Sequence, residues 1–177
     1  LLGVPVEMVT GRGGGITDES FQKKKQVIAQ AIALNQPNGK DPVDVLQKVG
    51  GFDLAAMCGA FLGAAASHRP VVIDGFISVV AALCAARLCP AARDYFVPSH
   101  LSYEIGYRLA LEELRLEPIF QLSMRLGEGS GCPLAFQVLS AACGIINDMA
   151  TFDQAGIDDG YLEEIREGDK FTVEARK

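Results

Sequence analysis

The stretch Pro70-Val71-Val72-Ile73-Asp74-Gly75 decides the fold. A short apolar run that ends in an acidic residue and a turn glycine is typical of a buried strand in a parallel sheet. An Ala-rich helix is predicted over Ile77–Leu88, and a second strand over Asp94–Pro98. A strand, a helix and a strand in this order indicate a parallel pair joined by a crossover helix. We therefore expect an α/β fold, with a Rossmann-like parallel sheet that helices cover on both faces.

The segments around this unit are predicted to be mostly helical. Phe52–Ser67 and Cys132–Met149 consist almost wholly of small and apolar residues, so both helices should be buried on every side. The spacing of Gly59 and Gly63 indicates close packing of a helix against the sheet. Pro118–Ser123 is a weaker strand candidate. Flanking helices are expected over Asp18–Leu34, Pro42–Lys48, Phe52–Ser67, Ser102–Leu114 and Cys132–Met149, and the charged stretch Asp158–Lys177 is expected to form a surface helix and a loose end.

The composition limits the class of protein. The 177 residues are 49% hydrophobic and carry a net charge of −6, which excludes an intrinsically disordered chain and argues against a nucleic-acid partner. The charge-free stretches Leu54–Ser67 and Gly75–Ala86 are shorter than the ~20 residues that span a bilayer, so no membrane partner is expected. Five cysteines without a CxxC pair, beside only two histidines, indicate reduced thiols in a cytoplasmic protein rather than a disulfide scaffold or a zinc site.

The run Gly11-Arg-Gly-Gly-Gly15 lies just before the first long helix. Backbone N–H groups at a helix N-terminus bind anions, but neither a Walker A nor a complete GxGxxG pattern is present, so a plain flexible loop is the alternative. At about 100° per residue, Lys24 falls on the apolar face with Phe21, whereas Lys23 points to solvent. Either the Lys24 amine reaches past the core to water, or an anion held by the loop compensates its charge. Together the two features favour phosphate.

Several polar side chains outside this loop are further candidates, and two of them have two interpretations each. Asp74 either faces a ligand or forms an Asx turn or a cap for the next helix. His100 is either a base or a structural hydrogen-bonding residue, and Ser99 and Ser102 are candidate caps for the helix that follows. Cys132 begins a helix, which would lower its thiol pKa. Nothing in the sequence pairs it with His100, and a GxSxG nucleophile elbow is absent, so a nucleophilic mechanism is not expected.

The segment Met124-Arg-Leu-Gly-Glu128-Gly-Ser-Gly131 carries the strongest indication of a site. A glutamate between glycines, just ahead of a long apolar helix, can be approached closely by a ligand. An apolar surround would raise the pKa of its carboxyl group towards that of a general base. The alternative is a solvated loop acid whose charge is balanced by Arg125.

Six segments occur together between Leu1 and about Gly156. They are Thr10-Gly-Arg-Gly-Gly-Gly15, Ala33-Leu-Asn-Gln-Pro37, Asp41-Pro-Val-Asp-Val-Leu-Gln-Lys-Val-Gly-Gly-Phe-Asp53, Val72-Ile-Asp-Gly-Phe-Ile77, Pro98-Ser-His-Leu-Ser102 and Met124-Arg-Leu-Gly-Glu-Gly-Ser-Gly131. In this order the sequence resembles the nicotinate-nucleotide–dimethylbenzimidazole phosphoribosyltransferases of the late cobalamin pathway, although Gly14 stands where that family often has Thr. We expect residues 1–156 to form the C-terminal part of the phosphoribosyltransferase α/β domain, and residues 157–177 a charged tail.

The resemblance implies a pentosyl transfer that needs no cofactor or metal. A ring nitrogen of 5,6-dimethylbenzimidazole would attack the anomeric carbon of nicotinate mononucleotide, which would give alpha-ribazole 5'-phosphate and nicotinate. Glu128 matches the general base of the family. By the same resemblance, the phosphate would be held by Gly13, Gly14, Gly15 and Lys24. The residues expected to line the substrate pocket are Asp74, Ser102, Arg125, Leu126 and Gly127, with the serine near the nicotinate carboxylate.

The chains of this family are much longer, so the resemblance implies that this chain is the C-terminal portion of a larger one. Its high apolar content and its beginning without Met agree with that expectation. Because the other half carries a second pocket glutamate and most benzimidazole contacts, we expect weak or no turnover from this chain alone. The resemblance also implies a homodimer. Two other classes stay open: a non-catalytic α/β domain that binds a nucleotide phosphate, and a structural domain whose Ala-rich helices pair with another chain.

Overall fold

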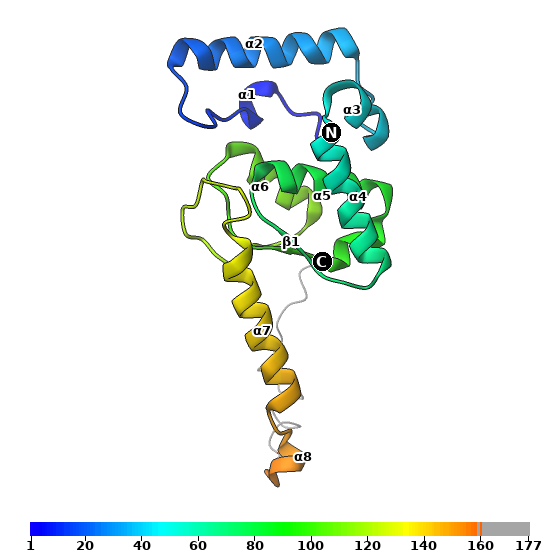
Figure 1. The fold of residues 1–177 in the computed structure, drawn as a ribbon, viewed down its shortest axis with the longest axis vertical. Helices are drawn as coiled ribbons and strands as arrows, with labels where there is room; N and C mark the ends of the chain where they lie inside the picture. The colour runs from blue at the N-terminus through cyan, green and yellow to red at the C-terminus, as the bar shows by residue number, and fades with distance from the viewer. Residues whose placement is uncertain (159, 161–177) are drawn as a thin grey trace. The chain divides into compact units, whose positions relative to one another are not determined.

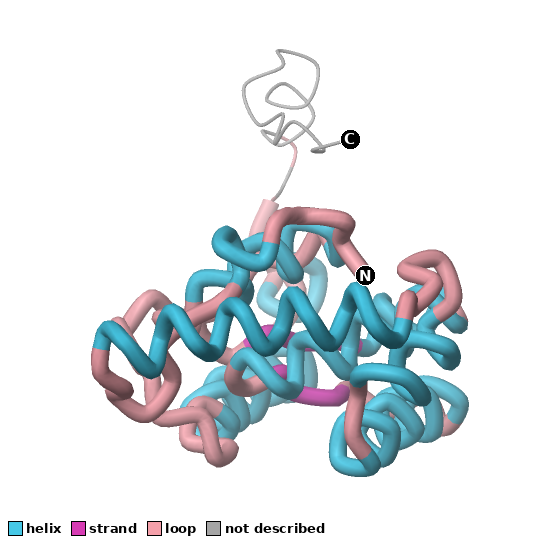
Figure 2. Tube along the Cα trace, turned by 90° about the horizontal axis from the view of Figure 1, so that it is seen from above, coloured by secondary structure: helices cyan, strands magenta, loops and turns pink. Residues whose placement is uncertain are grey.

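The two strands form the parallel pair that residues 70–98 predict. In the computed structural model, which describes residues 1–158 and 160, β1 (Val71–Ile73) pairs in parallel with β2 (Phe96–Pro98). Helix α5 (Phe76–Leu88) and the 3-10 helix η1 (Pro90–Tyr95) connect them (Figure 1). Figure 2 shows the short strands, in magenta, among the helices. The expected α/β class is confirmed, and the described sheet is a small parallel pair in a mostly helical chain.

The remaining helices agree closely with the sequence pattern. They are α1 (Val6–Val9), α2 (Asp18–Asn35), α3 (Pro42–Val49), α4 (Phe52–Ala66), α6 (Ile105–Leu114), α7 (Cys132–Asp148) and α8 (Phe152–Ala155). Thr17 caps α2 through Ser20 N–H, and Asp41 caps α3, in which Pro42 takes the tolerated first position. The short helices α1 and α8 were not predicted. Helix α6 begins at Ile105 rather than at the expected Ser102.

The predicted strand over Pro118–Ser123 is wrong. This segment makes only an isolated parallel bridge, between His100 and Phe120. Backbone hydrogen bonds of 2.8 and 3.0 Å hold Phe120 beside the chain that follows β2. Ser123 then has a left-handed φ of 54°, which an extended strand cannot contain, so the ladder does not continue.

The core lies between α4, α5, α6 and the strands. The rings of Phe61 and Phe96 meet edge to face, with centroids 5.0 Å apart. The middle of α5 is buried, and its Cys84 is fully enclosed in the same core cluster as Cys58. Burial raises the pKa of the Cys84 thiol to about 11. All five cysteines are free, which agrees with the predicted reduced thiols.

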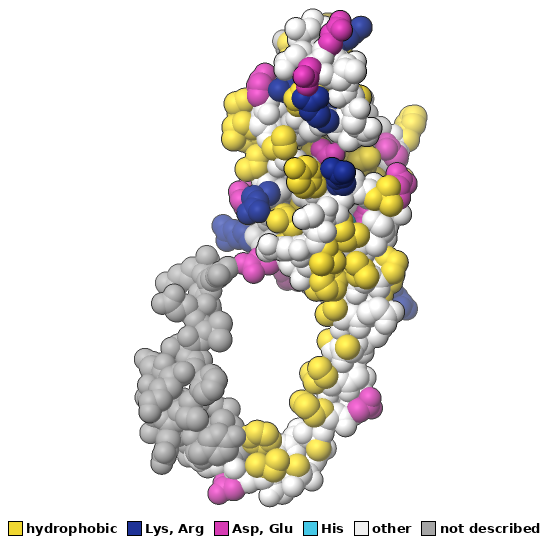
Figure 3. All heavy atoms as spheres, turned by 90° about the vertical axis from the view of Figure 1, so that its left-hand side faces the viewer, with side chains coloured by type: hydrophobic (Ala, Val, Ile, Leu, Met, Phe, Trp, Pro, Cys, Tyr) yellow, Lys and Arg dark blue, Asp and Glu magenta, His cyan; other side chains and the backbone are white. Residues whose placement is uncertain are grey.

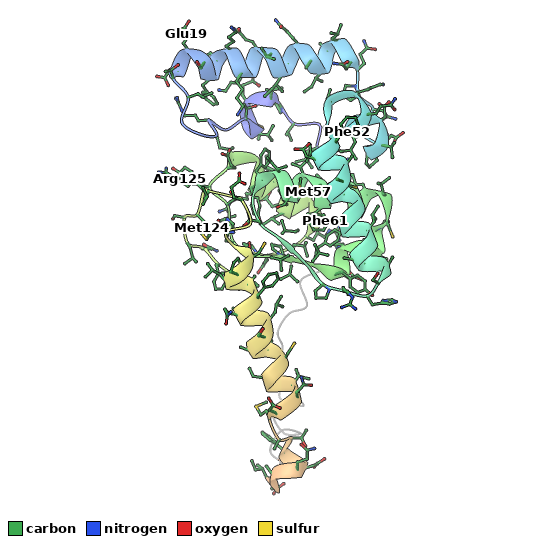
Figure 4. All side chains as sticks on the ribbon, viewed as in Figure 1. Glu19, Phe52, Met57, Phe61, Met124 and Arg125 are labelled. Atoms are coloured by element: carbon green, nitrogen blue, oxygen red, sulfur yellow. The ribbon has the colours of Figure 1, made fainter. Side chains whose placement is uncertain are left out.

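The expectation that α4 and α7 are buried on every side is wrong. Phe52 at the start of α4 (Figure 4) is 98% exposed. A methyl group added at Gly59 or Gly63 would meet open space. In α7 only Ala135 is buried. An apolar surface is buried only where another element covers it, and no described element covers these faces.

The chain divides into two compact units, Leu1–Gln137 and Val138–Lys177. The first unit contains both strands and the core cluster. In the second, α8 begins with a capping box between Thr151 and Gln154. Most of the predicted charged tail, 157–177, lies outside the described residues. In the part of the chain that is described, no helix is long and apolar enough to cross a membrane.

Candidate active site

Glu128 sits in a backbone conformation that its residue type disfavours. Gly127, Glu128 and Gly129 all have left-handed φ angles, of 72°, 55° and 76°. Glycine adopts this region freely, but for a residue with a Cβ atom it costs about 1–2 kcal/mol. The turn presents the exposed Glu128 side chain at a cleft of about 580 Å³. Strain of this kind collects at functional sites, where the surrounding structure maintains it.

Asp74 maintains this turn from the end of β1. Its buried carboxylate accepts hydrogen bonds from the N–H of Gly129 at 2.9 Å and of Gly131 at 2.7 Å. Hydrogen bonds to a charged group contribute about 1.5–3 kcal/mol each, enough to offset the cost of the Glu128 conformation. The interpretation of Asp74 as a cap for the next helix is wrong, because α5 has no side-chain cap. Its partners lie 55 and 57 residues away, on another loop.

His100 is part of the structural support and is not exposed to a ligand. It is fully buried, with Nδ1 2.9 Å from Ser99 Oγ and 3.9 Å from an Asp74 oxygen. Because the Ser99 hydroxyl donates its hydrogen to the Ile73 carbonyl, it accepts from the imidazole, which assigns the proton to Nδ1. Of the two predicted interpretations of His100, the structural one is therefore confirmed.

The glycine loop lines a second cleft, of about 830 Å³. Lys24 extends from α2 to this loop, and its Nζ donates to the Gly11 carbonyl at 2.8 Å. Arg12 pairs with Asp18 and lies over the ring of Phe21, 4.9 Å from its centroid. The expected burial of Lys24 is wrong: its side chain is exposed, and no residue of α2 is buried. Its proximity to the loop follows from its position on the first turns of α2.

The two clefts adjoin, since Glu104, Arg125 and Leu126 line both of them. Figure 4 shows Met57 and Phe61 extending from α4, and Arg125 from the loop ahead of Glu128. Glu104 is a site residue that the sequence did not indicate, because it lies in an ordinary helix start without flanking glycines. It contacts Gly11 so closely that a Cβ atom there would overlap its carboxylate.

The structure brings the predicted site residues together in these two clefts. The cleft at Glu128 is also lined by Asp74, Ser102, Arg125, Leu126 and Gly127, and the cleft at the glycine loop by Gly13, Gly14 and Gly15. Their roles stay predictions. Ser102 accepts a long hydrogen bond, 3.5 Å, from Glu104 N–H.

Cys132 lies at the edge of the same cleft. The prediction that its helix position would lower the thiol pKa is wrong: burial, and then the charge of Asp74, raise the pKa of Cys132. Among the described residues, no group of three or more His, Cys, Asp or Glu side chains is arranged to hold a metal ion.

Comparisons with known proteins show which family the chain matches. A family model described as a phosphoribosyltransferase matches residues 1–157. The chain is 50% identical over 173 residues to the nicotinate-nucleotide–dimethylbenzimidazole phosphoribosyltransferase of Clostridium perfringens, covering 98% of this chain and 48% of the relative. The enzyme of the same name from Geobacter sulfurreducens is 49% identical over 158 residues, covering 89% of this chain and 45% of the relative. This chain thus spans about half the length of the curated relatives that it matches.

Solved structures show the same fold. A crystal structure titled CobT from Thermus thermophilus superposes with a TM-score of 0.82 at 41% identity, covering 90% of this chain and 47% of that one. A crystal structure of the phosphoribosyltransferase from the same organism gives a TM-score of 0.79 at 40% identity, covering 90% and 46% of the two chains. With the family model spanning residues 1–157 of 177, the chain belongs to the nicotinate-nucleotide–dimethylbenzimidazole phosphoribosyltransferase family.

Proposed function

We propose that the protein transfers the phosphoribosyl group of nicotinate mononucleotide to 5,6-dimethylbenzimidazole, which gives alpha-ribazole 5'-phosphate and nicotinate in cobalamin biosynthesis. One observation carries this proposal. The clefts at the glycine loop and at Glu128 share three lining residues, so a nucleotide can extend from one to the other. The names of the relatives supply the substrates.

The phosphate belongs at the glycine loop in this proposal. Gly13, Gly14 and Gly15 precede α2, whose N-terminal N–H groups favour an anion. Lys24 lies beside the loop, with its ammonium group already within hydrogen-bond distance of the Gly11 carbonyl. An exposed lysine is available to an incoming phosphate. Because the net charge of the chain is −6, an anionic substrate is attracted by local cations such as this one and not by the overall charge.

The ribose belongs where the clefts meet. It connects the phosphate to the reacting carbon, and Glu104 lies at that junction. No hydrogen bond of the Glu104 side chain to a described residue competes for it, so its carboxylate is available to accept hydrogen bonds from ribose hydroxyls. Glu104 is therefore assigned here as the ribose contact.

The chemical step needs a base but no acid. A benzimidazole ring nitrogen attacks the anomeric carbon as the bond to the pyridinium nitrogen breaks, and the configuration inverts. The electron pair of the breaking bond neutralises the pyridinium, so nicotinate leaves without protonation. The other ring nitrogen of the nucleophile loses its proton to the Glu128 carboxylate. A positioned base of this kind contributes roughly 10²–10⁴-fold to the rate.

The rest of the pocket orients the bases. Ser102 is assigned to the nicotinate carboxylate, because its hydroxyl keeps a donor hydrogen beyond its long contact with Glu104 N–H. Arg125, Leu126 and Gly127 are assigned to the walls of the cleft around the reacting carbon.

The proposal includes a cytoplasmic homodimer. Free cysteines support a reducing compartment. Large apolar side chains that are 40–83% exposed follow α7, as Figure 3 shows in yellow, and support an association with a second copy. They are Leu134, Phe136, Val138, Ile145, Ile146 and Met149. Sedimentation equilibrium checks this: the full-length protein should be dimeric, and Ile146→Asp should shift it towards the monomer.

A turnover assay tests the proposal. The full-length protein is mixed with nicotinate mononucleotide and 5,6-dimethylbenzimidazole, and the phosphorylated product is measured by chromatography. Glu128→Gln should lower kcat by roughly 10²–10⁴-fold, and Glu112→Gln, an exposed position on α6, serves as the matched control. Unchanged turnover in the Glu128 variant would refute the assigned base. Binding of the nucleotide without any turnover in the wild type would favour the non-catalytic domain. The 177-residue chain by itself is assayed in parallel, and we expect it to show weak or no turnover.

A further inference from the structure

We propose that Asp74 is a positioning residue that holds the Glu128 turn in its reactive conformation and does not bind the substrate. This inference rests on the proposed function, in which Glu128 is the base. Asp74 lines the same cleft as Glu128, which on its own would make it a ligand candidate. Its hydrogen bonds point to the other role.

Both carboxylate oxygens of Asp74 are already engaged. Oδ2 accepts from Gly129 N–H at 2.9 Å and Oδ1 from Gly131 N–H at 2.7 Å, and the residue is only 6% exposed. The two donors are the first and third residues after Glu128. A single side chain therefore fixes the backbone on the C-terminal side of the base, in addition to the backbone hydrogen bonds from Ser130 N–H to the Gly127 carbonyl and from Cys132 N–H to the Gly129 carbonyl. Gly127, Glu128 and Gly129 keep their left-handed φ angles within this frame.

The same carboxylate meets the start of α7. This helix begins at Cys132, directly after Gly131, whose N–H donates to Asp74. A negative charge just ahead of a helix N-terminus is favourable. The same buried carboxylate thus contacts both the Glu128 turn and the residue that precedes α7.

Asp74 is itself held from two sides. Its own N–H donates to Ser78 Oγ at 3.0 Å, and that hydroxyl donates to the Gly75 carbonyl at 2.7 Å. On the other side, Gly131 packs against Ser99 and His100 with no room for a Cβ atom. The position of the carboxylate is thus set by β1 and by the buried wall behind it, independently of any substrate.

The kinetic test compares Asp74→Asn with Glu128→Gln in the full-length protein. An asparagine offers one acceptor oxygen and a donor NH₂, so one of the two loop N–H groups loses its partner. We expect kcat to fall about 10²-fold, as for a displaced reacting group, with KM for nicotinate mononucleotide within about threefold of wild type. In the Glu128→Gln background, Asp74→Asn should lower kcat no further, because the base that it positions is absent.

Three kinetic results would overturn the inference. A raised KM with unchanged kcat would make Asp74 a substrate ligand. Multiplicative losses in the double variant would mean that it acts independently of Glu128. Full activity in Asp74→Asn would mean that the contacts do not matter.

Hydrogen exchange on the wild-type protein tests the contact without a variant and without activity. The amides of Gly129 and Gly131 should exchange far more slowly than that of the exposed Gly14. Equal rates would overturn the inference even if Asp74→Asn failed to fold. If instead Glu128→Gln kept wild-type turnover, the proposed base would be wrong. Slow exchange of the two amides would in that case still show that Asp74 stabilises the turn.

Discussion

The two loops of the candidate site are built in opposite ways. The Glu128 turn rests on a buried carboxylate and on a glycine packed against a buried wall. The loop Gly11–Gly15 is exposed over most of its length, and the side chains of Lys24 and Glu104 contact it at Gly11. Around Gly14 there is open space.

This difference fits the different chemical demands that the proposed function makes on the two loops. A base must meet a proton at hydrogen-bond distance, and a small displacement of the reacting groups is costly. A phosphate is recognised by charge and by many N–H groups, and an open loop can close around it. We infer that the base side of the site is preorganised and that the phosphate side is completed by its ligand.

The largest loss of unfolding free energy should come from adding a side chain to the tightly packed loop that carries Glu128. Gly131→Ala places a methyl group against Ser99 and His100, so the loop or the buried wall must move. Overpacking of this kind costs about 1–3 kcal/mol of unfolding free energy, and turnover should fall with it. Urea denaturation measures the change. Gly14→Ala is the matched control, since its methyl group meets nothing within 4 Å and should alter the unfolding free energy by less than about 0.5 kcal/mol. Equal losses at both positions would remove the contrast between the loops.

The phosphate side should respond through binding. Lys24→Met removes the cation beside the glycine loop, and KM for nicotinate mononucleotide should rise about 10- to 100-fold while the unfolding free energy stays close to wild type. Lys23→Met is the control, because the neighbouring residue points elsewhere on α2. A loss of kcat without a change of KM would place Lys24 on the base side of the comparison.

The contacts of the Glu128 turn also show which features could be predicted from the sequence and which could not. The strand–helix–strand unit and the turn around Glu128 follow from local patterns of apolar residues and glycines. The hydrogen bonds from the Glu128 turn to Asp74 could not be predicted, because they join residues 55 and 57 positions apart and local sequence patterns do not indicate such contacts. The burial of α4 and α7 was overestimated for a related reason: composition shows that a helix surface is apolar, whereas burial depends on what covers it.

The junction of the loops offers a smaller test. Glu104→Ala should reduce the preference for nicotinate mononucleotide over its 2'-deoxy analogue by about tenfold, because one hydrogen bond to a ribose hydroxyl is lost. The start of α6 should be unaffected, since the Glu104 side chain makes no capping hydrogen bond there. Ratios of kcat/KM for the two nucleotides measure the preference, with Glu112→Ala as the control on the same helix. An unchanged ratio would assign the ribose to other groups.

The smallest effect concerns the thiol at the edge of the rigid turn. The pKa of Cys132 is raised, first by burial and then by the charge of Asp74, so its thiolate forms at higher pH than that of an ordinary cysteine. Since the thiolate is the nucleophile, carbamidomethylation of Cys132 should increase at higher pH than that of an ordinary cysteine. Asp74→Asn removes the negative charge, and the midpoint of the labelling profile should move to lower pH. Mass spectrometry follows Cys132 beside the exposed Cys143, which reports reagent reactivity in the same sample. The burial contribution persists in this variant, so the midpoint should move only part of the way towards that of an ordinary cysteine. An identical midpoint in the two proteins would show that the Asp74 carboxylate carries no charge next to the turn that it is proposed to hold.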